Sequence, residues 1–146
     1  MRKHPKTIDL EPWRFSDRPR VLIEHPDVGA GLDLATAIRR AGYAVAICRG
    51  PDAAADPATR CPLHQLEPCA IVEGADVVVT ALGFDREDAR AVLRGLRTRY
   101  PSTQLVIEAT VAEALELEDE LAGCVVVPQD ADPDRVAAEV SRLLAS

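Results

Sequence analysis

The stretch from Val21 to Cys48 limits the possible folds of this chain more than any other part of it. Residues 21–24 form a short apolar run, residues 29–41 carry apolar side chains at helical spacing, and residues 43–48 form a second apolar run. A short apolar run bounded by polar turn residues is typical of a buried strand. Two such strands joined by one helix form a right-handed βαβ unit, which begins a parallel sheet.

The rest of the chain continues the alternation of strands and helices. Three further strands are predicted at residues 76–82, 104–108 and 124–127, and three further helices at residues 85–100, 110–121 and 132–144. Thr110 and Glu113 are spaced as a capping box, and Pro133 suits the first position of the last helix. The pattern predicts an α/β fold, a three-layer sandwich around a five-stranded parallel sheet. The length of 146 residues and the lack of a glycine-rich phosphate turn favour the strand order 2-1-3-4-5.

Residues 1–19 form a polar N-terminal arm before a domain predicted over residues 20–146. The arm contains three prolines and shows neither a helical nor a strand period. One interpretation is a disordered tail. The alternative is an extended strap on this subunit or on a neighbour, because Leu10, Trp13 and Phe15 are large apolar side chains that usually cover a surface.

Residues 49–74 are the least regular part of the domain. Four prolines exclude one continuous helix, so we predict a loop rich in Cys and Pro in place of the second helix of the sheet. The loop holds Cys61, His64 and Cys69. Three alternatives stay open for these side chains: plain thiols, a disulfide between Cys61 and Cys69, or a metal site to which Cys48 also contributes.

The charge of the chain bears on its partners. The net charge is −7, although residues 1–20 hold six Lys or Arg and only three Asp or Glu, so the acidic charge is concentrated in the domain. An acidic domain repels phosphate backbones, which argues against nucleic-acid binding through its body. The sequence shows no apolar stretch of membrane-spanning length and no signal peptide. We therefore expect a cytoplasmic protein with reduced cysteines and no membrane partner.

The carboxyl ends of parallel strands meet at one edge of the sheet, where ligands bind in folds of this kind. The side chains predicted at this edge define a hypothetical ligand site made of Glu24, His25, Asp27, Thr80, Gly83, Asp85 and Thr110. His25 is either a catalytic base partnered by Asp27 or Asp85, or a polar turn residue, and the second interpretation is favoured. The sequence has no zinc-protease motif, phosphate loop or nucleophile–base pair, so we expect no enzymatic activity, no cofactor and no metal.

Four segments are similar, in order and spacing, to the receiver domain of response regulators. They read VLIEHPD, AIRRAGYAV, ADVVVTAL and CVVVPQDADPDRVAAEV, and they extend from Val21 to near Leu144. The resemblance implies a flavodoxin-like, CheY-like fold and a role in signal transduction. It also implies that the third segment is the phosphoacceptor strand and that the fourth contains the strand-five Lys-Pro position.

The residues that receivers use for phosphorylation differ in this chain. In the best register, His25 and Pro26 stand where two acidic residues of receivers hold Mg²⁺, with Asp27 one place late, whereas a shifted register offers Glu24. Ala81 stands at the position of the phosphoacceptor aspartate, Ala109 at that of the switch Ser or Thr, and Val127 at that of the lysine. An acyl phosphate needs a carboxylate nucleophile, and phosphoryl transfer needs a cation and the lysine to stabilise charge. The resemblance therefore predicts a non-catalytic pseudo-receiver that is not phosphorylated on aspartate.

A second resemblance keeps other functions open. Cobalamin-binding domains carry Asp-x-His-x-x-Gly after the first strand and Ser-x-Leu after the third. Gly29 matches this pattern and Thr80 matches it loosely, but Pro26 stands where the cobalt-ligating histidine belongs. A small-molecule binding module, for cobalamin or a nucleotide, is thus an alternative function. A redox-responsive switch through Cys61 and Cys69 is another.

The resemblance to receivers also indicates a surface for protein partners. Receivers commonly pair through the face formed by their fourth helix, fifth strand and fifth helix. In this chain the face corresponds to residues 111–121, 124–128 and 133–144. We therefore expect protein partners, and a homodimer in particular, with Trp13 and Phe15 of the arm as added contacts.

Overall fold

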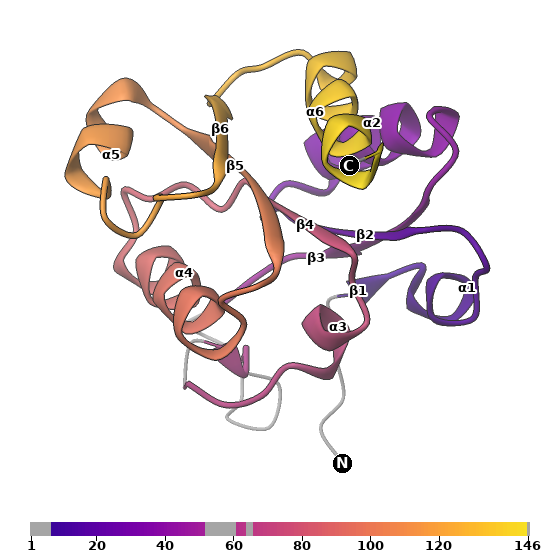
Figure 1. The fold of residues 1–146 in the computed structure, drawn as a ribbon, viewed down its shortest axis with the longest axis horizontal. Helices are drawn as coiled ribbons and strands as arrows, with labels where there is room; N and C mark the ends of the chain where they lie inside the picture. The colour runs from indigo at the N-terminus through magenta and orange to yellow at the C-terminus, as the bar shows by residue number, and fades with distance from the viewer. Residues whose placement is uncertain (1–6, 52–60, 64–65, 146) are drawn as a thin grey trace.

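The computed structural model describes residues 7–51, 61–63 and 66–145, which form a single sheet with helices on both of its faces (Figure 1). The strands are β1 (Thr7–Ile8), β2 (Arg20–Glu24), β3 (Ala44–Cys48), β4 (Val77–Thr80), β5 (Gln104–Ala109) and β6 (Val125–Pro128). The helices are α1 (Leu10–Arg14), α2 (Val28–Arg40), α3 (Ala70–Glu73), α4 (Glu87–Arg99), α5 (Val111–Glu116) and α6 (Pro133–Ala145). None of the helices in the described part of the chain is long and apolar enough to cross a bilayer.

The sheet has the strand order β1-β3-β2-β4-β5-β6. From β3 to β6 all strands are parallel, which confirms the predicted order 2-1-3-4-5. The prediction of a five-stranded, wholly parallel sheet is wrong at one edge, where β1 pairs antiparallel with β3 and Ile8 lies opposite Ile47. A strand of two residues in a polar arm has too few side chains to show a period of two, so no periodic signal predicts it.

The alternation of side chains along each strand divides the core into two layers. Val21 and Ile23 of β2 face α2 and α6 in an aliphatic cluster that also contains Leu34 and Val136. Leu22 faces the opposite cluster, with side chains from α1, α3 and α4. Figure 1 shows α2 and α6 on one side of the sheet and α3 and α4 on the other. Strands buried on both faces explain the nearly continuous apolar runs in the sequence.

The described part of the N-terminal arm folds onto its own chain. Trp13 on α1 is buried, and its indole Nε1 donates a hydrogen bond to the backbone oxygen of Val21 at 3.0 Å. The Arg20 guanidinium lies over the Trp13 ring, 5.8 Å from its centroid. The arm thus covers its own subunit, as in one of the two alternatives, although residues 10–14 are helical and not extended. Phe15 is exposed and does not share in the packing.

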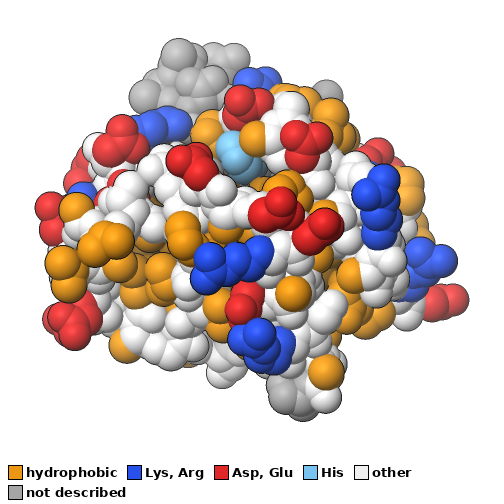
Figure 2. All heavy atoms as spheres, turned by 90° about the horizontal axis from the view of Figure 1, so that it is seen from above, with side chains coloured by type: hydrophobic (Ala, Val, Ile, Leu, Met, Phe, Trp, Pro, Cys, Tyr) orange, Lys and Arg blue, Asp and Glu red, His pale blue; other side chains and the backbone are white. Residues whose placement is uncertain are grey.

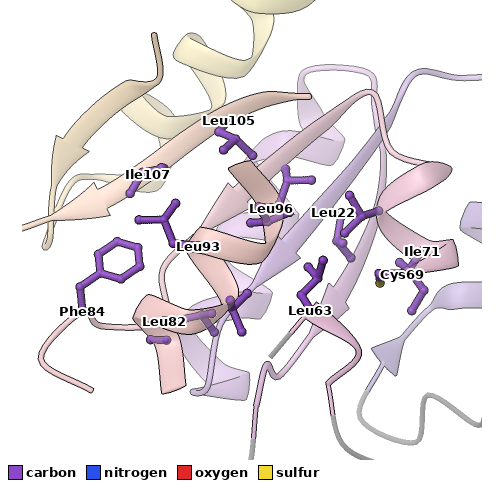
Figure 3. Packing of buried hydrophobic residues seen from close by; sticks show 14 of the residues in the cluster. Leu22, Leu63, Cys69, Ile71, Leu82, Phe84, Leu93, Leu96, Leu105 and Ile107 are labelled. Atoms are coloured by element: carbon purple, nitrogen blue, oxygen red, sulfur yellow. The ribbon is translucent and has the colours of Figure 1, made fainter. Parts of the chain in front are cut away.

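The segment between β3 and β4 contains only the short helix α3 in its described part. Leu63 nevertheless enters the core, and Figure 3 shows it on the same side of the sheet as Leu22 and Leu93. A Cβ placed on Gly95 of α4 would lie 2.5 Å from the backbone oxygen of Leu63. The backbone N–H of Cys69 donates to the hydroxyl of Tyr100 at 2.9 Å. These contacts fill the layer that a second long helix would otherwise fill.

Two predicted helices differ in length from the observed ones. The helix predicted from residue 85 begins at Glu87, and Arg86, not Asp85, precedes it without a capping side chain. The helix predicted over residues 110–121 ends at Glu116, after the predicted capping box of Thr110 and Glu113, which is present with both hydrogen bonds. Capping chemistry thus marked the starts of α5 and of α6, where Pro133 is the first helical residue, but not the start of α4.

Candidate functional site

A pocket of about 420 Å³ opens at the carboxyl edge of the sheet. It lies between the turn after β2, helix α2, the turn after β4, the end of β5 and the turn after β6. Its lining consists of His25, Pro26, Ala30, Asp33, Leu34, Ala81, Leu82, Gly83, Glu108, Glu113, Gln129, Asp130, Ala131 and Pro133. The location is the one that a parallel sheet of this topology favours for ligands.

Glu108 is the buried charged group of this pocket. Val106, two residues before Glu108 on β5, belongs to the aliphatic cluster packed against α2 and α6. Side chains two residues apart on a strand point to the same face, so Glu108 also faces this side of the sheet. The residue is only 9% exposed. Burial, together with the negative charge of Asp130, raises the pKa of its carboxyl group to about 7. Glu108 lies outside the predicted ligand site, although an acidic residue at the end of an apolar strand is a recognisable signal.

Two of the predicted ligand residues face the other side of the sheet. Glu24 follows Leu22 on the α3/α4 side, and both Glu24 and Thr80 are buried. The Thr80 hydroxyl donates a hydrogen bond to Glu24 Oε1 at 2.9 Å, which joins the ends of β2 and β4. Burial raises the pKa of Glu24 to about 7 despite this bond. The pair is therefore an internal tie between strands, and neither residue lines the pocket.

His25 and Asp27 form the turn before α2. Asp27 Oδ1 accepts the backbone N–H of Ala30 and so caps the helix, while the backbone N–H of Asp27 donates to His25 Nδ1 at 3.0 Å. Partial burial lowers the pKa of His25, and the charge of Asp27 acts against this. Because Nδ1 accepts a hydrogen bond, the neutral ring carries its proton on Nε2. This geometry agrees with a turn residue rather than with a base activated by the Asp27 carboxylate.

The remaining predicted ligand residues have separate roles. Gly83 lines the pocket with a φ of 82°, a conformation that favours glycine. Thr110 is occupied as the cap of α5. Asp85 is exposed and is not among the described residues that line the pocket. Of the seven predicted residues, the structure therefore brings only His25 and Gly83 into one cavity.

The predicted cysteine site is not assembled in the described residues. In this structure the four cysteines are thiols, and no disulfide joins Cys61 to Cys69. Burial raises the pKa of Cys69, and it raises the pKa of Cys48 to about 12, so both are held protonated. His64 lies outside the described residues. Within the described ranges no group of three or more metal-binding side chains occurs.

The positions that the receiver resemblance connects with phosphorylation are apolar at this edge. Ala81 directly follows β4 and lines the pocket. Ala109 is the last residue of β5 and pairs in register with Pro128 of β6. Val127 is buried in the α2/α6 cluster. The three positions that correspond to the phosphoacceptor, the switch residue and the lysine of receivers therefore carry hydrocarbon side chains.

The surface around the pocket is acidic. Figure 2 shows Asp and Glu side chains gathered near a histidine on the upper face of the molecule. Of the three histidines, only His25 belongs to the described residues. Asp33, Glu113 and Asp130 are the carboxylates that surround the pocket together with Glu108. No Lys or Arg is among the described residues of its lining.

Comparisons with known proteins give matches by structure only. No protein-family model matches the chain, and no curated protein matches it by sequence. The receiver domain of nitrogen regulatory protein C superposes with a TM-score of 0.65 at 18% identity, covering 89% of this chain and 97% of that one. The signal receiver domain of a protein described as a LuxO repressor, from Vibrio parahaemolyticus, gives 0.62 at 16% identity, covering 88% and 91%.

A longer protein shares the same fold over part of its length. The response regulator DrrB from Thermotoga maritima matches with a TM-score of 0.59 at 15% identity, covering 88% of this chain. The chain spans only 53% of DrrB. At such identities the likeness concerns the fold. The chain therefore has the α/β fold of CheY-like receiver domains, with a mostly parallel sheet and the added strand β1 at its edge.

Proposed function

We propose that this chain is a non-catalytic, receiver-like signalling domain of the cytoplasm that acts through protein contacts and is not phosphorylated on aspartate. The observation that supports the proposal is Ala81, which directly follows β4 where the resemblance places the phosphoacceptor. A methyl group cannot attack a phosphoryl donor. Val127, at the position of the receiver lysine, is buried among aliphatic side chains and has no charge to offer.

Incubation with acetyl phosphate and Mg²⁺, followed by intact-mass spectrometry, tests this proposal. We expect the mass to stay unchanged, because the chain has no carboxylate at the tip of β4. A receiver domain that retains its phosphoacceptor aspartate, treated in the same way, is the positive control. An added phosphoryl group that hydroxylamine removes would contradict the proposal, since acyl phosphates react in this manner.

The protein-contact part of the proposal is supported by an exposed apolar patch on α5 and β6. Val111 is 80% exposed and Leu115 is 70% exposed. Their spacing of four residues puts them on one side of α5. Val126 is exposed on β6, the edge strand of the sheet. Hydrophobic side chains are visible on the side of the molecule where α5 lies, at the left of Figure 2. Such patches are typical of protein interfaces.

The occupant we propose for this patch is a second copy of the chain. Sedimentation velocity over a range of protein concentrations tests it with the variant Leu115→Glu. We expect the unmodified protein to form a dimer and the variant to remain monomeric, because a buried charge without a partner destabilises an interface. Leu32→Glu, which alters an exposed leucine on α2, is the matched control and should still dimerise. A monomer of the unmodified protein at the highest concentration would contradict the dimer.

A further inference from the structure

We propose that the pocket at the carboxyl edge of the sheet binds a small aliphatic amine, whose ammonium group pairs with the carboxylate of Glu108. This inference does not depend on the proposed signalling role, because it concerns a different face from the α5–β6 patch. It rests on three observations: a largely buried glutamate whose carboxylate borders the pocket without a protein partner in the described structure, the sign of the charges around it, and the apolar lining of the pocket.

The carboxylate of Glu108 has no compensating group in the described structure. The residue is more than nine-tenths buried and borders the pocket. No described group donates a hydrogen bond to it, and the nearest charge that acts on it is the like charge of Asp130. A buried carboxyl group is costly when it lacks a hydrogen-bond donor or a cation. A bound cation supplies both.

The charges around the pocket select for a cationic ligand. Asp33, Glu113 and Asp130 add three carboxylates to that of Glu108, and the described lining has no Lys or Arg. Glu113 also accepts the backbone N–H of Thr110, which fixes its position. His25 has a lowered pKa and is uncharged at pH 8, so it does not repel a cation there. Anionic ligands such as phosphates are disfavoured by the same charges.

The apolar part of the lining favours an organic cation over a bare metal ion. Leu34, Ala81, Leu82 and Pro133 offer hydrocarbon surface next to the carboxylates. No group of three or more metal-binding side chains converges among the described residues. A volume of about 420 Å³ is larger than a single ion needs and accommodates a short carbon chain. An ammonium group carried on such a chain meets both kinds of surface.

Calorimetric titration of the full chain with defined probes tests the inference. The probes are 1,4-diaminobutane and n-butylamine as cations, n-butanol as the neutral counterpart, and MgCl₂ as the metal, at constant ionic strength and pH 8. We expect both amines to bind with a Kd on the order of 1 mM, as their small size permits. At tenfold excess over Kd the melting temperature should rise by about 4 °C. Butanol should have no effect.

Two charge-matched variants locate the binding. Glu108→Gln keeps the size of the side chain and removes its charge, and it should weaken amine binding at least tenfold. Glu118→Gln removes an exposed carboxylate that does not line the pocket, and it should bind as the unmodified chain does. Circular dichroism checks that both variants are folded. Equal amine binding by Glu108→Gln and the unmodified chain would overturn the assignment.

The pH dependence gives an independent check. Amine binding requires the ionised form of Glu108, whose pKa is raised to about 7. The affinity should therefore increase about tenfold from pH 6 to pH 8. The other titratable groups that face the pocket are His25, Asp33, Glu113 and Asp130, and protonation of any of them at low pH acts in the same direction. Binding by MgCl₂ alone, or by no probe, would overturn the inference.

Discussion

Glu24 and Glu108 lie near the carboxyl ends of two strands, but their side chains face opposite sides of the sheet. Burial raises the pKa of each to about 7. Glu24 has a hydrogen-bond donor in Thr80, whereas Glu108 faces a pocket. The difference between the two carboxyl groups is set by one property of strands, the alternation of successive side chains between the two faces. The sequence places both residues at the same edge but does not show which of them meets a cavity.

The substitution Glu24→Gln should make the protein more stable at alkaline pH. A folded-state pKa above the unfolded value of 4.5 means that stability falls as the pH rises from about 4.5 to about 7. The variant cannot ionise and keeps an acceptor for Thr80. We expect its free energy of unfolding to exceed that of the unmodified chain by less than about 1 kcal/mol at pH 5 and by about 3 kcal/mol at pH 8.

Urea denaturation followed by circular dichroism at a series of pH values measures this difference. Glu118→Gln, at an exposed site, should change the free energy of unfolding by less than about 0.5 kcal/mol at every pH. A constant difference between Glu24→Gln and the unmodified chain from pH 5 to pH 8 would show that Glu24 ionises normally in the folded protein.

The packing of helix α4 depends on Gly95, because the missing side chain permits a close approach to another part of the backbone. Gly95 lets α4 approach the backbone of Leu63, and this approach holds the irregular segment between β3 and α3 against the core. Tyr100, directly after α4, binds the backbone of Cys69 in the same segment. These two contacts, at Gly95 and at Tyr100, hold the irregular segment against the core. In other sheets of this topology a second long helix covers this part of the core.

Gly95→Ala should destabilise the fold although alanine is the better helix former. The added methyl group would lie 2.5 Å from the Leu63 oxygen, a backbone atom that cannot move aside alone. Overpacking of this kind outweighs the gain in helix propensity, and we expect a net loss of about 1–2 kcal/mol in urea denaturation. Gly29→Ala on α2 is the control, because its methyl group would meet only the Asp27 side chain, at 3.3 Å. Equal effects of the two substitutions would contradict the close approach.

The elements that were predicted correctly have strong periodic signals, and those that were not have weak ones. The strands around β2 and the long helices α2 and α6 follow from apolar runs and helical spacing. Strand β1 and helix α1 have no periodic pattern, because β1 has only two residues and α1 is anchored by one large side chain, Trp13, which bonds to the backbone of Val21. Of the residues predicted for a ligand site at this edge, only His25 and Gly83 line the pocket. A side chain at this edge can line the pocket only if it does not cap a helix and if it lies on the right face of its strand. The sequence alone shows neither property, nor how exposed the side chain is.

The sheet ends differently at its two edges. The end strands β1 and β6 each have one neighbouring strand in the described structure, but β1 has only two residues whereas β6 has four. An uncovered strand edge is a site of association between chains. A two-residue end strand offers few free backbone groups, so we expect a second chain to pair at β6 rather than at β1. The arrangement is consistent with the dimer proposed through α5 and β6.

Removal of β1 should change the size of the assemblies. Deletion of residues 1–8 uncovers the outer edge of β3, so we expect species larger than a dimer in sedimentation velocity at high concentration. Deletion of residues 1–6 leaves β1 in place and is the matched control, which should sediment as the full chain does. Identical behaviour of the two deletions would show that β1 has no protective role.

The buried indole of α1 gives this protein an optical reporter of its own. The chain has one tryptophan, and its ring is packed where the N-terminal segment meets the end of α3, with Gly74 close by. Its emission therefore senses the docking of that segment and little else. A red shift in the emission without loss of ellipticity would reveal detachment of the segment from an otherwise intact sheet, an event that most spectroscopic probes would miss.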